Sequence, residues 1–460
     1  MRLPCPGGGS SFSAAQGVPV PSASRALSDV SRPVPSLWRD ADFRRLWVGQ
    51  TASQLGEQAN LVVLPLLAVL TLGTGAGGLG LLRAAGQAPV LVLSLFVGAW
   101  VDRWRTRTVM VLADAGRAVV LGAAVVAGVL GVLGLPALFA VAVAIGALSV
   151  FFDVAYQASL VRLVRRDQLV RGNSALEGSR SAAQIGGPAL GGAWVSALPA
   201  PVAVASSVPF FVLSFLTIRR IRGSESVPER AERPAPVRRR IHEGLRFVAR
   251  DPALRAVGAA SAAFQFFFAA TMTVYLLFLP RELHFSGTAV GLALAATGPG
   301  ALLGSLLAAR LPRRFGHGTV LVTAAALGDG VMLCVPALHG PAALTVPAVV
   351  AVNFAFGAVG QLVNVTVMAV RQAVTPDRMQ GRVAATITFA GMGLAPLGSL
   401  LGGLLAQVCG LRTGLAVTAA GMLLSPAVMA LSPLARLGRT LPAPRDAAPA
   451  AAPPAEPPPA

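Results

Sequence analysis

The chain contains no lysine, so all 38 of its basic residues are arginine, and charged residues of either sign make up only 12% of it. Without lysine there is no phosphate-binding loop of the form G-x-x-x-x-G-K-[ST], so direct use of ATP is unsupported. The three cysteines, Cys5, Cys334 and Cys409, lie far apart and match no metal-binding or disulfide spacing. The four histidines fall in connections or at the ends of apolar blocks, and no catalytic nucleophile is visible. We therefore expect no catalytic residues, no metal and no cofactor.

Apolar residues dominate what is present. Hydrophobic residues make up 54% of the 460 positions, and the mean hydropathy is +0.68. Twelve apolar blocks can be read between roughly Phe43 and Leu434, each near the ~20 residues that a membrane-spanning helix needs. The net charge of +19 is carried by arginines beside these blocks, where anionic lipid headgroups are the natural partner and nucleic acid is not. The composition predicts an all-α membrane protein with twelve transmembrane helices.

Arginine is concentrated in alternate connections between the blocks. The even-numbered connections contain Arg103, Arg105 and Arg107; Arg162, Arg165, Arg166 and Arg171; Arg310, Arg313 and Arg314; and Arg371, Arg378 and Arg382. The odd-numbered connections contain only Arg281 and Arg412. Because basic loops stay in the cytoplasm, this pattern predicts that both termini and the longest polar interval are on the cytoplasmic side of the membrane.

Composition also divides the chain into five parts. Residues 1–36 are rich in Gly, Ser and Pro, and residues 436–460 are rich in Pro and Ala, so both are expected to be disordered tails. Residues 37–218 and 254–435 are expected to form two six-helix bundles. Between them, residues 219–253 are expected to form a cytoplasmic linker, in which IHEGLRFVAR is typical of a short amphipathic helix on the membrane surface.

The two halves resemble each other, which predicts two pseudo-symmetric bundles. LVRRDQLVRG after block 4 corresponds to AVTPDRMQGR after block 10, and GGPALGG in block 5 corresponds to APLGSLLGG in block 11. G-x-x-x-G pairs in blocks 5, 8 and 11 indicate close helix packing, and they are candidate surfaces along which the bundles rock. These pairs are Gly187 and Gly191, Gly300 and Gly304, and Gly398 and Gly402.

Blocks 1, 4, 7 and 10 each carry a stripe of polar residues at three- and four-residue steps. Polar stripes in hydrocarbon must face water or another helix, and we expect these four helices to line a central cavity. Hydrogen bonding between helices is the alternative. The candidate cavity residues are Gln54, Asn60, Tyr156, Gln157, Gln265, Tyr275, Gln361 and Asn364.

Three acidic residues within the blocks are candidates for coupling to protons: Glu57, Asp153 and Asp329. Glu57 is the strongest, because it lies about mid-helix on the block 1 stripe with no basic residue one turn away. In block 3, Asp114 and Arg117 are spaced to form an ion pair, and a structural role is expected for it.

The connection GAWVDRWRTR resembles the cytoplasmic signature G-x-x-x-D-R-x-G-R-[RK] of the major facilitator superfamily. Gly98, Asp102, Arg103 and Arg107 match it, whereas Arg105 and Thr106 depart from it. The resemblance implies that Asp102 acts as a gate between the bundles.

GGPALGG is similar to the antiporter signature G-P-x-x-G-G, which is associated with exporters. Its matching residues are Gly187, Pro188, Gly191 and Gly192.

Over about residues 37–434, longer segments resemble the drug:proton antiporter branch that contains macrolide-efflux proteins and enterobactin exporters. They include LWRDADFRRLWVGQTASQLGEQ and VRQAVTPDRMQGRV. The resemblance implies a monomeric exporter that expels a hydrophobic or amphipathic small molecule, such as a drug, antibiotic or siderophore, in exchange for protons. A lysophospholipid flippase and a non-transporting sensor of the same fold are the alternatives.

Overall fold

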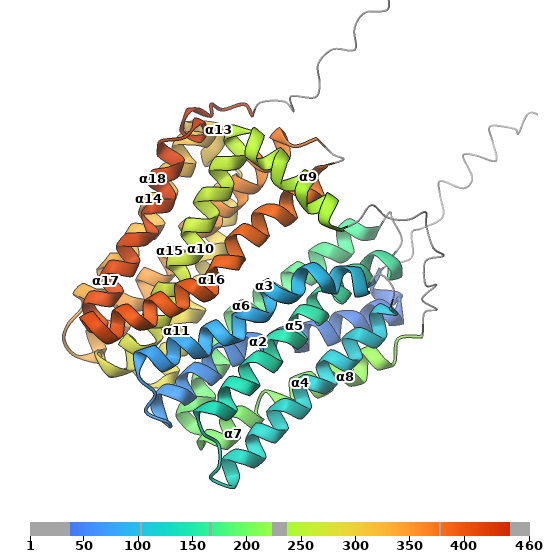
Figure 1. Ribbon diagram of the computed structural model, residues 1–460, viewed down its shortest axis with the longest axis vertical. Coiled ribbons are helices and arrows are strands. Elements are labelled where there is room, and N and C mark those ends of the chain that lie inside the picture. Colours follow the sequence, from blue (N-terminus) through green and yellow to red (C-terminus); the bar gives the residue numbers. More distant parts are fainter. Residues whose placement is uncertain (1–36, 102–103, 165–167, 223–236, 377–378, 442–460) are drawn as a thin grey trace, which may run out of the picture.

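The structure is a computed structural model that describes residues 37–101, 104–164, 168–222, 237–376 and 379–441 (Figure 1). All of its regular elements in these ranges are helices. The N-terminal bundle contains, after a short turn η1 (Leu37–Arg39), the helices α2 (Ala41–Leu70), α3 (Ala76–Val101), α4 (Thr106–Val129), α5 (Leu135–Leu163), α6 (Leu169–Ala197), α7 (Ala200–Ala205) and α8 (Val208–Arg219).

The C-terminal bundle repeats this arrangement after the linker helix α9 (Val237–Arg250). It contains α10 (Pro252–Arg281), α11 (Gly287–Ala295), α12 (Thr297–Ala308), α13 (Leu311–Phe315), α14 (His317–Val331), η3 (Met332–Ala337), α15 (Ala342–Val374), α16 (Gln380–Cys409), α17 (Leu411–Met422), α18 (Leu424–Ala430) and η5 (Pro433–Arg436). Pro188 in α6 and Pro396 in α16 occupy corresponding helices of the two halves, as the internal repeat predicts.

Eleven helical segments in the described residues are long and apolar enough to cross a membrane. Several are made of consecutive pieces, such as α7 with α8 and α11 with α12. The segment that is not among them is α6, which is 29 residues long but carries polar residues such as Asn173, Glu177, Arg180 and Gln184. With α6 as the fifth span, the chain has the twelve transmembrane helices that the sequence predicts.

An aspartate caps the N-terminus of the first helix in each bundle. The carboxylate of Asp40 accepts hydrogen bonds from the backbone N–H groups of Asp42 and Phe43 at the start of α2. Asp251 does the same for Ala253 and Leu254 at the start of α10. Each carboxylate satisfies backbone donors that have no partner within the helix.

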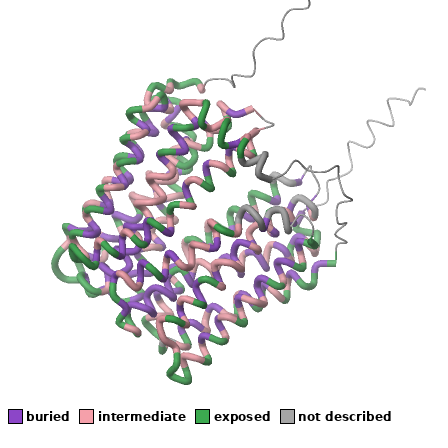
Figure 2. The backbone as a smooth tube through the Cα atoms, viewed as in Figure 1, coloured by how far each residue is buried: buried purple, intermediate pink, exposed green. Residues whose placement is uncertain are grey.

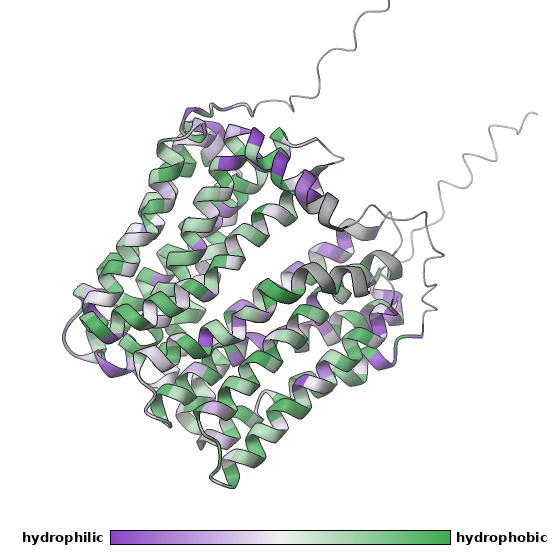
Figure 3. Ribbon diagram, viewed as in Figure 1, coloured by the Kyte–Doolittle hydropathy of each residue, from purple (hydrophilic) through white to green (hydrophobic). Residues whose placement is uncertain are grey.

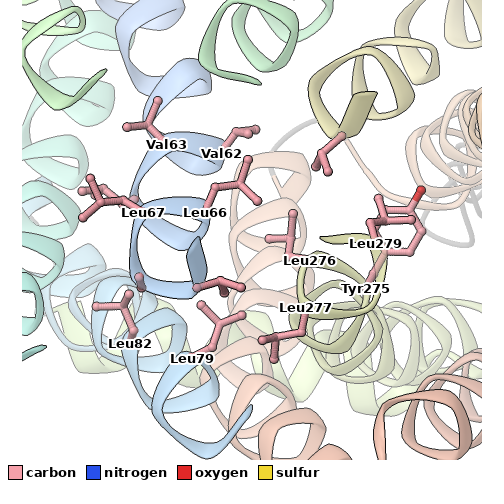
Figure 4. Close-up of a cluster of buried hydrophobic side chains, with 14 of the residues drawn as sticks. Val62, Val63, Leu66, Leu67, Leu79, Leu82, Tyr275, Leu276, Leu277 and Leu279 are labelled. Atoms are coloured by element: carbon pink, nitrogen blue, oxygen red, sulfur yellow. The ribbon is translucent and has the colours of Figure 1, made fainter. Parts of the chain in front are cut away.

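The two bundles share a core at one end and have separate cores at the other. One apolar cluster joins α2 and α3 to α10, α11 and α17, and Figure 4 shows Leu66 and Leu79 of one bundle near Leu276 and Leu277 of the other. A second cluster contains only residues of the N-terminal bundle, and a third only residues from Phe247 onward. In Figures 1 and 2 the bundles accordingly converge at the end near α11 and diverge toward the end where α9 lies.

Glycines bring the bundles into backbone contact at the joined end. A Cβ on Gly192 of α6 would collide with the backbone of Gly287 and Gly291 on α11. A Cβ on Gly80 of α3 would meet the backbone of Gly403 on α16 at 2.9 Å. These positions require glycine because any side chain would separate the helices. We call these two contacts the glycine seam. Arg281 adds a hydrogen bond across the bundles, from Nη2 to the carbonyl of Thr74 at 2.7 Å.

The predicted G-x-x-x-G pairs pack inside the bundles instead. A Cβ on Gly191 would lie 2.7 Å from the carbonyl oxygen of Ala59 on α2, and Gly304 and Gly402 contact α15 and α10 of their own bundle. The suggestion that these pairs form the surfaces between the bundles is therefore wrong. Spacing identifies a face on which backbones can approach closely, but it does not identify the helix that approaches it.

Two further expectations concern segments outside the spans. The structure has a helix, α9, where the sequence predicts the amphipathic helix of the linker, and its place on the membrane surface stays a prediction. This helix docks on α16, where Arg382 pairs with Glu243 at 2.6 Å. The expectation that packing stops at about Arg436 is wrong for residues 436–441. The backbone N–H of His317 donates to the carbonyl of Gly438, and Leu441 packs against the core of the C-terminal bundle. The rest of both predicted tails lies outside the described residues.

Candidate functional site

Arg117 lies at the centre of a group of charged side chains inside the N-terminal bundle. It is 0% exposed. Its Nη2 lies 3.2 Å from Oδ1 of Asp114, one turn earlier on α4, and its Nη1 lies 3.7 Å from Oε2 of Glu57 on α2. Ser53, on α2, donates a hydrogen bond of 3.1 Å to the same oxygen of Asp114. We call Glu57, Asp114, Arg117 and Asp153 the ionic cluster.

Aromatic rings cover the guanidinium of Arg117 from two further helices. Its central carbon lies 4.5 Å from the ring centroid of Phe152 on α5 and 5.0 Å from that of Phe211 on α8. The faces of aromatic rings attract cations, and more strongly where water is absent. The charge of Arg117 is thus balanced by carboxylates and π faces contributed by four helices.

Asp153 follows Phe152 on α5 and completes the ionic cluster. It is half-buried and interacts electrostatically with Glu57 and Arg117 within the cluster and with Arg180 on α6. Oε2 of Glu57 and Oδ2 of Asp114 are buried without a hydrogen-bond partner in the described part of the chain. Two carboxylates, those of Asp114 and Glu57, therefore lie within 4.0 Å of the completely buried Arg117. Asp153 adds a third carboxyl group nearby, and it interacts with Arg180 as well as with Arg117.

The reason for choosing Glu57 from the sequence is wrong, although its role remains a prediction. Glu57 was expected to have no cation nearby, but Arg117 reaches it from α4. The predicted ion pair between Asp114 and Arg117 is present. Sequence spacing shows which residues share a helix face and does not show what the neighbouring helix places against that face.

A pocket of about 480 Å³ lies mainly within the C-terminal bundle. Its wall comes from α10, α12, α14, α15 and α18, with Gln184 of α6 contributed by the other bundle. Three phenylalanine rings are stacked in this wall. Phe264 and Phe268 have centroids 5.3 Å apart, and Phe268 and Phe356 have centroids 5.7 Å apart, with nearly parallel planes in both pairs.

Asp329 of α14 lines this pocket and is only 4% exposed. Its Oδ2 is buried without a hydrogen-bond partner, and in the described ranges no arginine or histidine lies within 4.0 Å of its carboxylate. Asp329 therefore differs from the carboxylates of the ionic cluster, which share Arg117.

The predicted cavity residues occupy three different environments. Gln265, Gln361 and Asn364 line the pocket in the C-terminal bundle. Gln54 and Asn60 are buried within α2, whereas Tyr156 is half-buried and Gln157 is exposed on α5.

Tyr275 does not line the pocket. It is 0% exposed and lies in the shared core of the bundles (Figure 4). Asn353 donates a short hydrogen bond to its hydroxyl. In block 1, Ser53 and Glu57 contact α4. The expectation of a single central cavity lined by helices 1, 4, 7 and 10 is therefore wrong for these positions, and the alternative of contacts between helices describes them.

The predicted gate residues are only partly described. Asp102 and Arg103 lie outside the described residues, and Gly98 lies on α3. Arg107 donates a hydrogen bond to the carbonyl of Arg219, so it joins the start of α4 to the end of α8. In the antiporter motif, Gly187 and Gly191 face α2, Gly192 faces α11 of the other bundle, and Pro188 lies inside α6.

Sequence reasoning missed Arg117 as the centre of a cluster, and it missed the glycine seam. A signal for Arg117 was available, because an arginine within an apolar helix requires more than one compensating group. Gly80 and Gly403 offered no signal, because each is one of 50 glycines and the contact joins residues far apart in the sequence.

Two repeated six-helix bundles, joined at one end and parted at the other, with charged side chains buried inside the N-terminal bundle, define a multi-pass membrane transporter of the major facilitator type. The chain belongs to the transmembrane secretion effector family of this superfamily, whose sequence model matches residues 35–453. Hydropathy agrees with a membrane location, since apolar residues cover most of the helices in Figure 3. The predicted superfamily and the prediction of a transporter rather than an enzyme are confirmed.

Similar proteins agree with this assignment. The multidrug efflux pump Tap of Mycobacterium tuberculosis is 29% identical over 384 residues, covering 78% of this chain and 85% of Tap. A bacterial homologue of the iron transporter ferroportin, solved in an inward-facing state, has a TM-score of 0.68 at 16% identity and covers 84% of this chain and 97% of its own. The nucleoside transporter NupG has a TM-score of 0.69 at 12% identity, with 85% and 98% covered. The solved structures share the fold.

Proposed function

We propose that this protein is a secondary active exporter that expels hydrophobic or amphipathic small molecules in exchange for protons. The observation that carries this proposal is the ionic cluster, in which Glu57 and Asp114 lie within 4.0 Å of Arg117 and Asp153 interacts electrostatically with it, within the membrane-spanning part of the N-terminal bundle. Similarity to a multidrug efflux pump and the antiporter motif on α6 support the direction of transport.

The carboxyl groups of this cluster are suited to binding and releasing protons. Arg117 can balance one carboxylate, and Arg180 interacts with Asp153 from an exposed position on α6. A buried carboxyl group that neither arginine balances is less costly to bury when it carries a proton. Glu57 has access to solvent, since its side chain is 23% exposed whereas those of Asp114 and Arg117 are fully buried. Asp153 is half-buried. In the proposed cycle, Glu57 gains a proton in one conformation and loses it in the other, with Asp153 as a second candidate.

Alternating access would couple this exchange of protons to the movement of cargo across the membrane. The bundles part at the α9 end, which we propose is cytoplasmic because the arginine-rich connections favour that side. Cargo would enter the pocket region from the cytoplasm of the bacterial cell, and rocking of the bundles would open the other end. In this proposal the energy source is the proton gradient without a cofactor, the working unit is a monomer, and the partners are cargo, protons and membrane lipids.

The test is transport by Glu57→Gln in proteoliposomes with a defined pH gradient. Glutamine keeps the shape and polarity of glutamate but cannot take up or release a proton. We expect gradient-driven accumulation of a fluorescent amphipathic compound to be lost, while exchange without a gradient continues at least in part. The matched control is Glu282→Gln, which removes an exposed carboxylate at the joined end and should leave transport unchanged.

Unchanged uphill transport by Glu57→Gln would move the coupling role to Asp153 or Asp329. If variants neutralised at each of the three positions still pump, proton antiport is the wrong mechanism. Translocation of a labelled lysophospholipid with no drug transport would favour a flippase, and binding without counterflow would favour a sensor.

A further inference from the structure

The pocket around Asp329 combines an unpaired carboxylate with a stacked aromatic wall. Asp329, Phe264, Phe268 and Phe356 all line it, and the planes of the three rings are nearly parallel to one another. Its polar lining is completed by amides and hydroxyls such as Gln265, and its described lining contains no arginine and no histidine. The site therefore has negative charge and π faces but no positive group.

A buried carboxylate with an unsatisfied oxygen is costly unless a counter-charge or a proton reaches it. In the ionic cluster, Arg117 supplies that counter-charge. At Asp329 the described residues supply none. A cation from outside the protein would satisfy the carboxylate, and aromatic faces would favour the same charge. Flat ring systems also pack against the faces of phenylalanine.

We propose that this pocket binds organic monocations that carry a flat aromatic ring system, with the cationic nitrogen held at Asp329 and the ring system packed against the phenylalanine wall. This proposal rests on the exporter function proposed above and names a cargo class for it. The volume of about 480 Å³ lies within the range of about 300–1,000 Å³ that is usual for small-molecule sites.

Both bundles contribute to this site. Gln184 of α6 is part of the wall, and the neighbouring Ile185 occupies the space that a Cβ on Gly298 of α12 would need. Movement of α6 against α12 would therefore change the shape of the pocket. Cargo bound at Asp329 would in this way favour one arrangement of the bundles over the other, since a ligand shifts an equilibrium by its difference in affinity for the two states.

The test uses two probes of nearly equal shape and different charge. N-methylacridinium is a permanent cation, and acridine is uncharged at mildly alkaline pH. Both are fluorescent, so binding to the purified full-length protein in detergent can be followed by titration. The wild-type protein should prefer N-methylacridinium. Asp329→Asn should weaken binding of the cation by about tenfold or more, as expected for loss of an interaction with a charged group, and should leave acridine binding nearly unchanged.

Three further variants keep the test decisive. Asp329→Glu retains the charge and should retain the preference for the cation. A Cβ on Gly360 meets no atom within 4 Å, so Gly360→Leu should fill part of the pocket without a backbone clash and weaken both probes. Glu282→Gln removes the same charge far from the pocket and should change neither probe.

Equal binding of the two probes by the wild-type protein, or equal loss of both in Asp329→Asn, would overturn the proposal. Displacement of N-methylacridinium by sodium chloride but not by choline chloride would assign the site to an inorganic cation and would also overturn it. Failure here is distinguishable from failure of the exporter function, because the Glu57→Gln test measures gradient-driven transport in proteoliposomes, whereas the two acridine probes measure binding to the purified protein.

Discussion

A buried guanidinium needs negative groups around it, and the groups around Arg117 come from other helices as well as from α4. Asp114 contacts it from one turn away, Glu57 from α2, and Phe152 and Phe211 cover its faces. Removing one partner of a buried ion pair leaves the other charge uncompensated, which usually costs more than the pair itself contributes. Arg117 is therefore expected to stabilise the bundle as well as to influence the carboxylates around it.

Replacement of Arg117 by leucine should lower the free energy of unfolding by about 3–5 kcal/mol, because Asp114 is left buried without its counter-charge. The measurement is thermal unfolding of the purified protein in detergent. The double variant Arg117→Leu with Asp114→Leu removes both charges and should recover much of the lost stability. A double variant that is less stable than the single one would contradict this account of the cluster.

At the scale of helices, glycine determines which elements approach each other. Gly191, Gly304 and Gly402 hold helices together within a bundle, whereas Gly192 and Gly80 belong to the seam between bundles. The two kinds of contact should respond differently to added side chains. In the proposed cycle of alternating access, contacts within a bundle persist, whereas the seam opens when the bundles rock.

Gly192→Leu should shift the protein toward the conformation in which the α9 ends of the bundles are closer, because leucine cannot fit against the backbone of α11. Spin labels at Arg171 and Ala385, exposed residues at that end of α6 and α16, would report a shorter distance by pulsed electron paramagnetic resonance. Gly304→Leu collides within the C-terminal bundle, so it should reduce stability without this shift. An unchanged distance in a stable Gly192→Leu protein would show that the seam does not control the conformation.

The sequence predicts elements well and their partners poorly. Apolar length identifies eleven of the spans, and the internal repeat supplies α6, whose polar face lowers its hydropathy. The pairing of Asp114 with Arg117 follows from spacing on one helix. Contacts such as Glu57 with Arg117, or Gly80 with Gly403, depend on how separate helices pack, which no periodicity in a single segment contains.

At the scale of the whole molecule, two similar bundles carry different chemistry. The N-terminal bundle holds carboxylates around a fixed arginine, and the C-terminal bundle holds Asp329 in an aromatic pocket. In the proposed mechanism, the two similar bundles move symmetrically. Proton exchange takes place in the N-terminal bundle, and cargo binds in the C-terminal bundle.

The proposed orientation can be tested in intact cells. In a cysteine-free background, a single cysteine at His242 on α9 should resist a membrane-impermeant maleimide, because the arginine-rich connections are expected in the cytoplasm. A cysteine at Glu282, an exposed position at the joined end, should react. The reverse pattern of labelling would place α9 outside the cell and overturn the topology. Permeabilised cells provide the control for reactivity of both positions.

The position of Asp114 and Arg117 on one helix also affects how the protein is made. Each charge alone would oppose insertion of α4 into the bilayer, by about 2.5–3.5 kcal/mol at mid-membrane. Since they lie one turn apart, they can enter as a neutral pair. Glu57 emerges from the ribosome earlier, on α2, and meets its partner only when α4 arrives. Nascent chains that end before α4 should therefore hold α2 less firmly in the bilayer than chains that include it.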